Sequence, residues 1–125
     1  MPSILFVDDN NDHLIVLGIL LEQQGFSVTT YSSAAEALNE ANRQHFDVVL
    51  CDLRMPEMSG EDFLRAYREE LGKQTPGVIL SAEVEAIDES TPTLPNTRYC
   101  NKENCSRNLL RHLNASLVEK ENKTH

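Results

Sequence analysis

Basic side chains are scarce in this chain of 125 residues, which has 11 lysines and arginines against 20 aspartates and glutamates and a formal net charge of −9. Binding to nucleic acid normally requires a basic patch that neutralises phosphates. The charge balance therefore argues against direct contact with DNA. An excess of acid usually serves solubility, but it can also gather carboxylates at a metal site.

Long apolar runs and paired cysteines are also lacking. Apolar runs such as ILFV at 4–7 are far too short to span a membrane, and Asp8 and Asp9 interrupt any hydrophobic signal region. The three cysteines include no C-x-x-C pair and make no disulfide framework. These absences predict a cytoplasmic protein without membrane attachment, in which Cys51 and Cys100 are core thiols.

Short apolar runs alternate with helical patterns along the chain. Strands are expected at 4–7, 28–31, 46–51, 77–80 and, more weakly, 97–100. Helices are expected at 11–24, 33–43, 59–71 and 104–118, whereas Pro92 and Pro95 limit 83–96 to a short helix and an irregular loop. Short buried strands between helices predict an α/β fold with a parallel sheet covered on both faces. The length suits a single domain.

Apolar residues at helical spacing define the buried face of each expected helix. They are Leu14, Leu17, Gly18 and Leu21 in the first helix, Ala37, Leu38 and Ala41 in the second, Phe63, Leu64, Tyr67 and Leu71 in the third, and Leu110, Leu113 and Leu117 in the last. The polar residues from Glu119 onward are expected to fray.

Polar side chains collect where the expected strands end. They are Asp8 and Asp9 after the first strand, Asp52 after the third, Ser81 after the fourth, and Asn101 and Lys102 after the fifth. In an open parallel sheet these ends form the ligand crevice. Neighbouring carboxylates repel unless a hard cation such as Mg²⁺ neutralises them. One carboxylate could then attack a phosphoryl group, with a lysine and a hydroxyl holding its oxygens.

The sequence resembles the receiver domains of two-component response regulators. The matching stretches are FVDDN at 6–10, CDLRMPEMSG at 51–60, LSA at 80–82 and YCNK at 99–102. The resemblance runs from about Ser3 to Leu117. It implies a flavodoxin-like doubly wound fold with five parallel strands in the order 2-1-3-4-5, a receiver domain at 1–118 and a polar tail at 119–125.

The resemblance assigns the chemistry to specific residues. Asp52 is expected to accept a phosphoryl group from a histidine kinase or a histidine phosphotransfer protein. Asp8, Asp9 and Asp52, together with the backbone carbonyl of Arg54, are expected to bind Mg²⁺. The protein would be a phosphoacceptor that assists its own phosphorylation and dephosphorylation rather than an enzyme.

The resemblance also implies a conformational switch. Ser81 and Lys102 would pair with the phosphoryl group, and Tyr99 would move inward as the switch aromatic. A phosphoryl group adds charge and strong acceptor oxygens, so the loops that carry its partners follow it. The face built from 83–117 would then change shape to control an unknown downstream protein or output domain, and it could support phosphorylation-dependent dimerisation.

Two positions bear on the lifetime of the phosphoryl group. The resemblance implies that Arg54 and Glu83 flank the path of the hydrolysing water, and an ion pair between them would slow hydrolysis. The alternative is two solvated charges on mobile loops, where a surface pair contributes little. Glu103 departs from the family, which commonly has proline after the lysine, and this leaves the conformation of the loop at 102–103 open.

Three other functions are compatible with a fold of this kind. A docking module that has lost phosphorylation would keep the fold, but the intact acids, serine and lysine argue against it. A phosphohydrolase would need a second acid two residues after Asp52, where the chain has Arg54. A flavin carrier would need a phosphate-cradling loop after the first strand, where Asp8 and Asp9 would repel a phosphate. His13 is expected at the surface near the pocket, without a catalytic role.

Overall fold

The computed structural model describes residues 2–40, 43–72, 74–81 and 94–101, together with 110, 111, 113–115 and 117. Five parallel strands form one sheet in the order β2-β1-β3-β4-β5. They are β1 (Ser3–Val7), β2 (Ser27–Tyr31), β3 (Val48–Asp52), β4 (Gly77–Ser81) and β5 (Thr97–Asn101). This sheet confirms the expected fold class and strand order.

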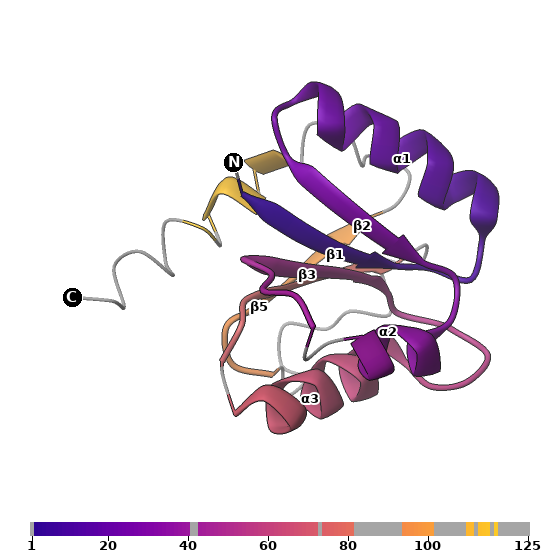
Figure 1. The fold of residues 1–125 in the computed structure, drawn as a ribbon, viewed down its shortest axis with the longest axis vertical. Coiled ribbons are helices and arrows are strands. Elements are labelled where there is room, and N and C mark those ends of the chain that lie inside the picture. The colour runs from indigo at the N-terminus through magenta and orange to yellow at the C-terminus, as the bar shows by residue number, and fades with distance from the viewer. Residues whose placement is uncertain are drawn as a thin grey trace.

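Helices cover both faces of the sheet (Figure 1). The helix α1 (Asn11–Gln23) lies above the sheet in this view, and α2 (Ala34–Glu40) and α3 (Gly60–Leu71) lie below it. The partly buried Leu110 and Leu117 and the buried Leu113 pack in the same cluster as the buried face of α1. The part of the last helix that is described therefore shares the α1 side.

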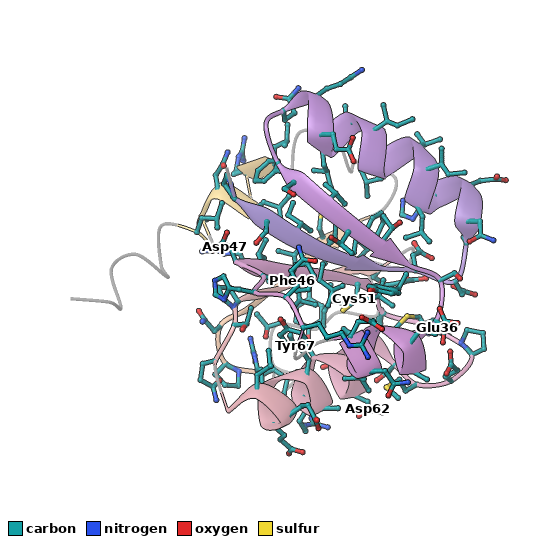
Figure 2. The ribbon with its side chains drawn as sticks, viewed as in Figure 1. Glu36, Phe46, Asp47, Cys51, Asp62 and Tyr67 are labelled. Carbon is teal, nitrogen blue, oxygen red and sulfur yellow. The ribbon has the colours of Figure 1, made fainter. Side chains whose placement is uncertain are left out.

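Alternate residues of each central strand enter opposite layers of the core. Ile4 and Phe6 of β1 pack on the α1 side, whereas Leu5 and Val7 pack toward α2 and α3. Both sets are fully buried, as expected for parallel strands with helices on either face. Figure 2 shows the lower layer, in which Cys51 and Tyr67 are buried between the sheet and α3.

Side chains and glycines set the helix ends. The Asn10 side chain accepts the His13 N–H at the start of α1 (3.2 Å), and the Ser59 hydroxyl accepts the Asp62 N–H at the start of α3 (3.1 Å). Gly25 (φ 97°), two residues beyond α1, and Gly72 (φ 64°), at the end of α3, adopt the positive φ that favours glycine. The predicted buried faces of α1 and α3 agree with the structure, with Leu71 only partly buried.

Two predicted boundaries need correction. The second helix was expected to reach Arg43, but Arg43 lies in a turn in which its N–H donates to the Glu40 carbonyl (3.0 Å). The third strand was expected at 46–51, but β3 begins two residues later and includes Asp52. Just before β3, the Asp47 N–H donates to the Ser3 carbonyl (2.9 Å), but the Ser3 N–H donates to the Asp47 carboxylate (2.8 Å) rather than to a backbone carbonyl.

A charged side chain is buried where periodicity suggested only an apolar stripe. Arg68 of α3 is 6% exposed, and burial lowers the pKa of its guanidinium. Its Nε donates to the Thr75 carbonyl (2.9 Å), and its terminal nitrogen donates to the Asn96 carbonyl (3.0 Å) and the Thr97 hydroxyl (3.3 Å). Arg68 thus ties the end of α3 to the loops that precede β4 and β5.

Several expectations fall wholly or partly on residues that are not described. They concern Ala41, the short helix expected within 83–96, the greater part of 104–118 and the tail at 119–125. Cys51 and Cys100 are buried in the core, as predicted. Among the described residues, no helix has both the length and the apolar character needed to cross a membrane.

A candidate metal site of three acids

The strand register brings the predicted site residues to one edge of the sheet. Val7 at the end of β1 pairs with Cys51 of β3, so Asp8 and Asp52 follow side by side. Ser81 ends β4 on the other side of β3, where Asp52 pairs with Leu80. The chain places these groups together because parallel strands end at the same edge.

Asp8, Asp9 and Asp52 form an acidic cluster. Each can offer a carboxylate oxygen so that these atoms all lie within 4.8 Å of one another. Asp8 is fully buried, Asp52 is 6% exposed, and Asp9 is exposed. Buried carboxylates this close repel one another, so the arrangement favours a cation that offsets their charge.

The donor set fits Mg²⁺. This ion prefers oxygen ligands at about 2.1 Å in octahedral geometry, so ligands on opposite sides of it lie about 4 Å apart. The three oxygens need only a small movement to converge on one such ion. The exposure of Asp9 leaves room for the water ligands that Mg²⁺ usually keeps. Asp8, Asp9 and Asp52 are therefore the residues that could hold the metal.

The Asp8 carboxylate is held by the segment that begins α1. The Asn10 N–H donates to Asp8 Oδ1 (3.0 Å), and His13 Nδ1 contacts Asp8 Oδ2. The expectation placed His13 at the surface near the pocket, whereas its ring is partly buried and packs edge-on against Phe6. The contact joins residues five apart, so it arises once α1 turns back over the end of β1.

The backbone around Asp52 is closely packed. The Leu53 N–H donates to the Leu80 carbonyl (2.7 Å), and the Gly60 N–H donates to the Leu53 carbonyl (2.8 Å). A Cβ at Gly60 would lie 2.4 Å from the Asp52 carbonyl oxygen, so only glycine fits between α3 and β3 here. The Arg54 N–H donates to Asp52 Oδ1 (3.4 Å). Burial and the neighbouring Asp52 raise the pKa of the Cys51 thiol, which stays protonated.

The expected switch residues are only partly described. Ser81 is 3% exposed at the end of β4, whereas Lys102 and Glu83 lie outside the described residues. The Tyr99 hydroxyl donates to Glu61 Oε2 at 2.7 Å, and burial together with this carboxylate raises the tyrosine pKa. Sequence reasoning missed Glu61, because no local pattern links residues so far apart in the chain.

Comparison with known proteins decides the family. Residues 4–96 match the family model of the response regulator receiver domain. The chain belongs to this family. A receiver domain is the phosphoacceptor domain of a two-component system, and such domains bind Mg²⁺ at an acidic pocket like the one formed here by Asp8, Asp9 and Asp52.

Relatives of this receiver domain are longer proteins. It is 42% identical to the response regulator protein TodT of Pseudomonas putida over 80 aligned residues. This alignment covers 63% of the chain and 35% of TodT. It is 34% identical to the transcriptional regulatory protein ZraR of Escherichia coli over 101 aligned residues. This alignment covers 81% of the chain and 19% of ZraR. The chain therefore spans about a third of the one and a fifth of the other.

Solved structures share the fold. A response regulator receiver domain protein from Clostridium thermocellum superposes with a TM-score of 0.82 at 27% identity, covering 97% of this chain and 98% of that one. The chemotaxis protein CheY4 of Vibrio cholerae superposes with a TM-score of 0.77 at 28% identity, covering 94% and 99%. Both comparisons agree with the sheet order described above.

Proposed function

We propose that this receiver domain is a phosphorylation-activated signalling switch in which Asp52 accepts a phosphoryl group from a histidine kinase or a histidine phosphotransfer protein. The cluster of Asp8, Asp9 and Asp52 carries the proposal, because oxygens within 4.8 Å of one another can share one Mg²⁺ ion beside the acceptor. Membership of the family supports it. The proposed domain comprises 1–118, followed by a polar tail at 119–125.

The transfer step uses the Asp52 carboxylate as nucleophile. One Asp52 oxygen forms a bond to phosphorus while the phosphorus–nitrogen bond of the donor phosphohistidine breaks. The electron pair of that bond stays on the imidazole nitrogen, which then takes a proton. Asp8, Asp9, Asp52 and the Arg54 carbonyl would hold Mg²⁺, which when bound offsets the negative charge of the phosphoryl oxygens.

The conformational response to phosphorylation is proposed to begin at the ends of β4 and β5. Ser81 and Lys102 are proposed to bind the phosphoryl oxygens, and Tyr99 is proposed to move with them. The face at 83–117 would then change shape and act on a downstream protein or an output domain, with dimerisation as one form of that response. Because the chain spans only part of TodT and ZraR, what those whole proteins do does not transfer directly.

A protein phosphodonor is supported by the surface beside the acids. Ile15, Val16 and Ile19 of α1 are more than half exposed, and α1 begins two residues after Asp9. Such apolar exposure is typical of surfaces that bind other proteins.

We propose a cytoplasmic location and no direct binding to nucleic acid or membrane. A docking module that is never phosphorylated is the alternative.

The lifetime of the phosphoryl group is proposed to depend on Arg54 and Glu83. An ion pair between them would lie across the phosphoryl group and obstruct the hydrolysing water. The adduct of Arg54→Asn should then decay faster than that of the unaltered protein. Equal decay would indicate two independent solvated charges.

The experiment that tests phosphorylation follows the mass of the protein with acetyl phosphate and Mg²⁺. We expect a labile adduct that disappears in Asp52→Asn and when EDTA removes the metal. Asp62→Asn is the matched control, because Asp62 is an exposed acid of α3 whose carboxylate contacts Arg65 (3.1 Å). It should be phosphorylated like the unaltered protein.

The outcomes distinguish a phosphorylated switch from a docking module that is never phosphorylated. An adduct that persists in Asp52→Asn would show that the acceptor is a different residue. No adduct in the folded protein, together with no binding of beryllofluoride, would favour the docking module.

A further inference from the structure

His13 holds one oxygen of a candidate metal ligand. Its Nδ1 contacts Asp8 Oδ2, while the other oxygen, Oδ1, accepts the Asn10 N–H (3.0 Å). A carboxylate that binds a metal ion is ionised and only accepts hydrogen bonds, so in the metal-binding state Nδ1 is the donor in this contact. The two bonds reach the carboxylate from the same short segment and fix the plane of the fully buried Asp8 side chain.

The imidazole ring is itself fixed in place. It packs edge-on against Phe6, with ring centroids 5.8 Å apart and an interplanar angle of 80°. The His13 backbone N–H donates to the Asn10 side chain at the start of α1 (3.2 Å). A ring held by a helix end and by a buried aromatic can impose one orientation on its partner carboxylate.

We propose that His13 is a positioning residue for the divalent metal site: it orients the Asp8 carboxylate toward the shared space with Asp9 and Asp52. A carboxylate has about four acceptor positions, so bonds to His13 and Asn10 are compatible with coordination of an ion. Ligands that are themselves hydrogen-bonded are commonly needed for full metal affinity. The inference rests on the magnesium site of the proposed function and goes beyond it.

Two other roles for His13 give different results. If His13 blocked the Asp8 oxygen that the ion requires, removal of the imidazole would strengthen metal binding. If the ring only filled space against Phe6, an apolar side chain of similar size would replace it without effect. A positioning role requires the donor at the location of Nδ1.

Mg²⁺ titration calorimetry on the unphosphorylated protein distinguishes these roles. His13→Leu keeps apolar packing against Phe6 but removes the donor, and we expect its Kd for Mg²⁺ to rise about tenfold or more. His13→Asn places an amide nitrogen near the position of Nδ1, and its Kd should lie within about threefold of the unaltered value. His45→Ala is the control, because His45 contacts Asp47 (3.4 Å), before β3, at the end of that strand away from the acids.

The outcomes separate this inference from the proposed function. Loss of affinity in His13→Leu with rescue in His13→Asn supports positioning. Equal or tighter binding in His13→Leu overturns it while leaving the magnesium site intact, and so does equal weakening in both variants. If the unaltered protein bound no Mg²⁺, both the metal site and the role of His13 would be wrong. Urea midpoints of all variants verify that each is folded during the titration.

Discussion

At the scale of single residues, the bond between Tyr99 and Glu61 joins the proposed switch residue to α3. The hydroxyl donates to a carboxylate at 2.7 Å in a partly buried setting. Hydrogen bonds to charged groups contribute about 1.5–3 kcal/mol, and partial exposure moves this one to the low end. The bond would therefore stabilise the orientation that Tyr99 has in the unphosphorylated protein.

Tyr99→Phe tests this bond because it removes only the hydroxyl. We expect the free energy of unfolding in urea to fall by about 1 kcal/mol or more. Tyr31→Phe is the control, since Tyr31 is also partly buried but has no comparable bond among the described residues, and it should change stability by no more than about 0.5 kcal/mol. Equal effects of the two substitutions would mean that the bond to Glu61 contributes nothing.

At the scale of elements, the approach of α3 to the end of β3 depends on Gly60. The first residue of α3 packs against the Asp52 carbonyl and the Cys51 sulfur, which a Cβ would meet at 2.4 and 3.2 Å. Because the closest of these atoms belongs to a buried strand, it cannot move away as a flexible side chain would. Any larger residue must push the helix off the strand that carries Asp52.

Gly60→Ala should lower the free energy of unfolding by about 1–3 kcal/mol, the usual cost of overpacking, and should also slow phosphorylation by acetyl phosphate. Gly18→Ala is the matched control within α1, where a Cβ would lie at an ordinary 3.8 Å from Thr30. It should be neutral or stabilising, since alanine favours helices over glycine by about 1 kcal/mol. Urea denaturation measures both, and equal stability of the two variants would contradict the close packing.

At the scale of the whole molecule, buried ionisable groups predict how stability depends on pH. Burial raises the pKa of Tyr67 to about 12, and it also raises the pKa of Tyr99 and Cys51. These groups ionise at about 8.5–10 in the unfolded chain. Their stabilising contribution is therefore complete below that range and is lost as the pH rises toward the folded values.

We expect the urea midpoint to fall steadily from about pH 9 to pH 11. Tyr67→Phe removes one of the titrating groups, so its midpoint should fall less over the same interval. Circular dichroism at several pH values gives both curves. A midpoint that stays constant to pH 11 would show that the folded protein does not hold these protons.

Local pattern in the sequence was sufficient to locate most of the fold and the candidate acids. Continuous apolar runs in β1 and β3 mark strands that are buried on both faces, as expected for a parallel sheet covered by helices. Every parallel strand ends at the same edge of the sheet, so the positions of Asp8, Asp9 and Asp52 along the chain place them at that edge, and the pairing of β1 with β3 makes them neighbours. Periodicity is a weaker guide to the ends of helices and strands. Asp47 was expected in the third strand and Arg43 in the second helix, but neither residue lies there.

Tertiary structure alone decided which polar groups meet. The partner of Tyr99 is Glu61, and the partners of Arg68 are a carbonyl before β4 and two groups at the start of β5. No periodic pattern encodes such pairs, because they depend on how α3 packs across the sheet after both have formed. The same holds for His13, whose spacing places it on α1 but whose contact with Asp8 requires the helix to fold back over β1. The sequence by itself determined where the carboxylates gather, whereas packing decided what holds them.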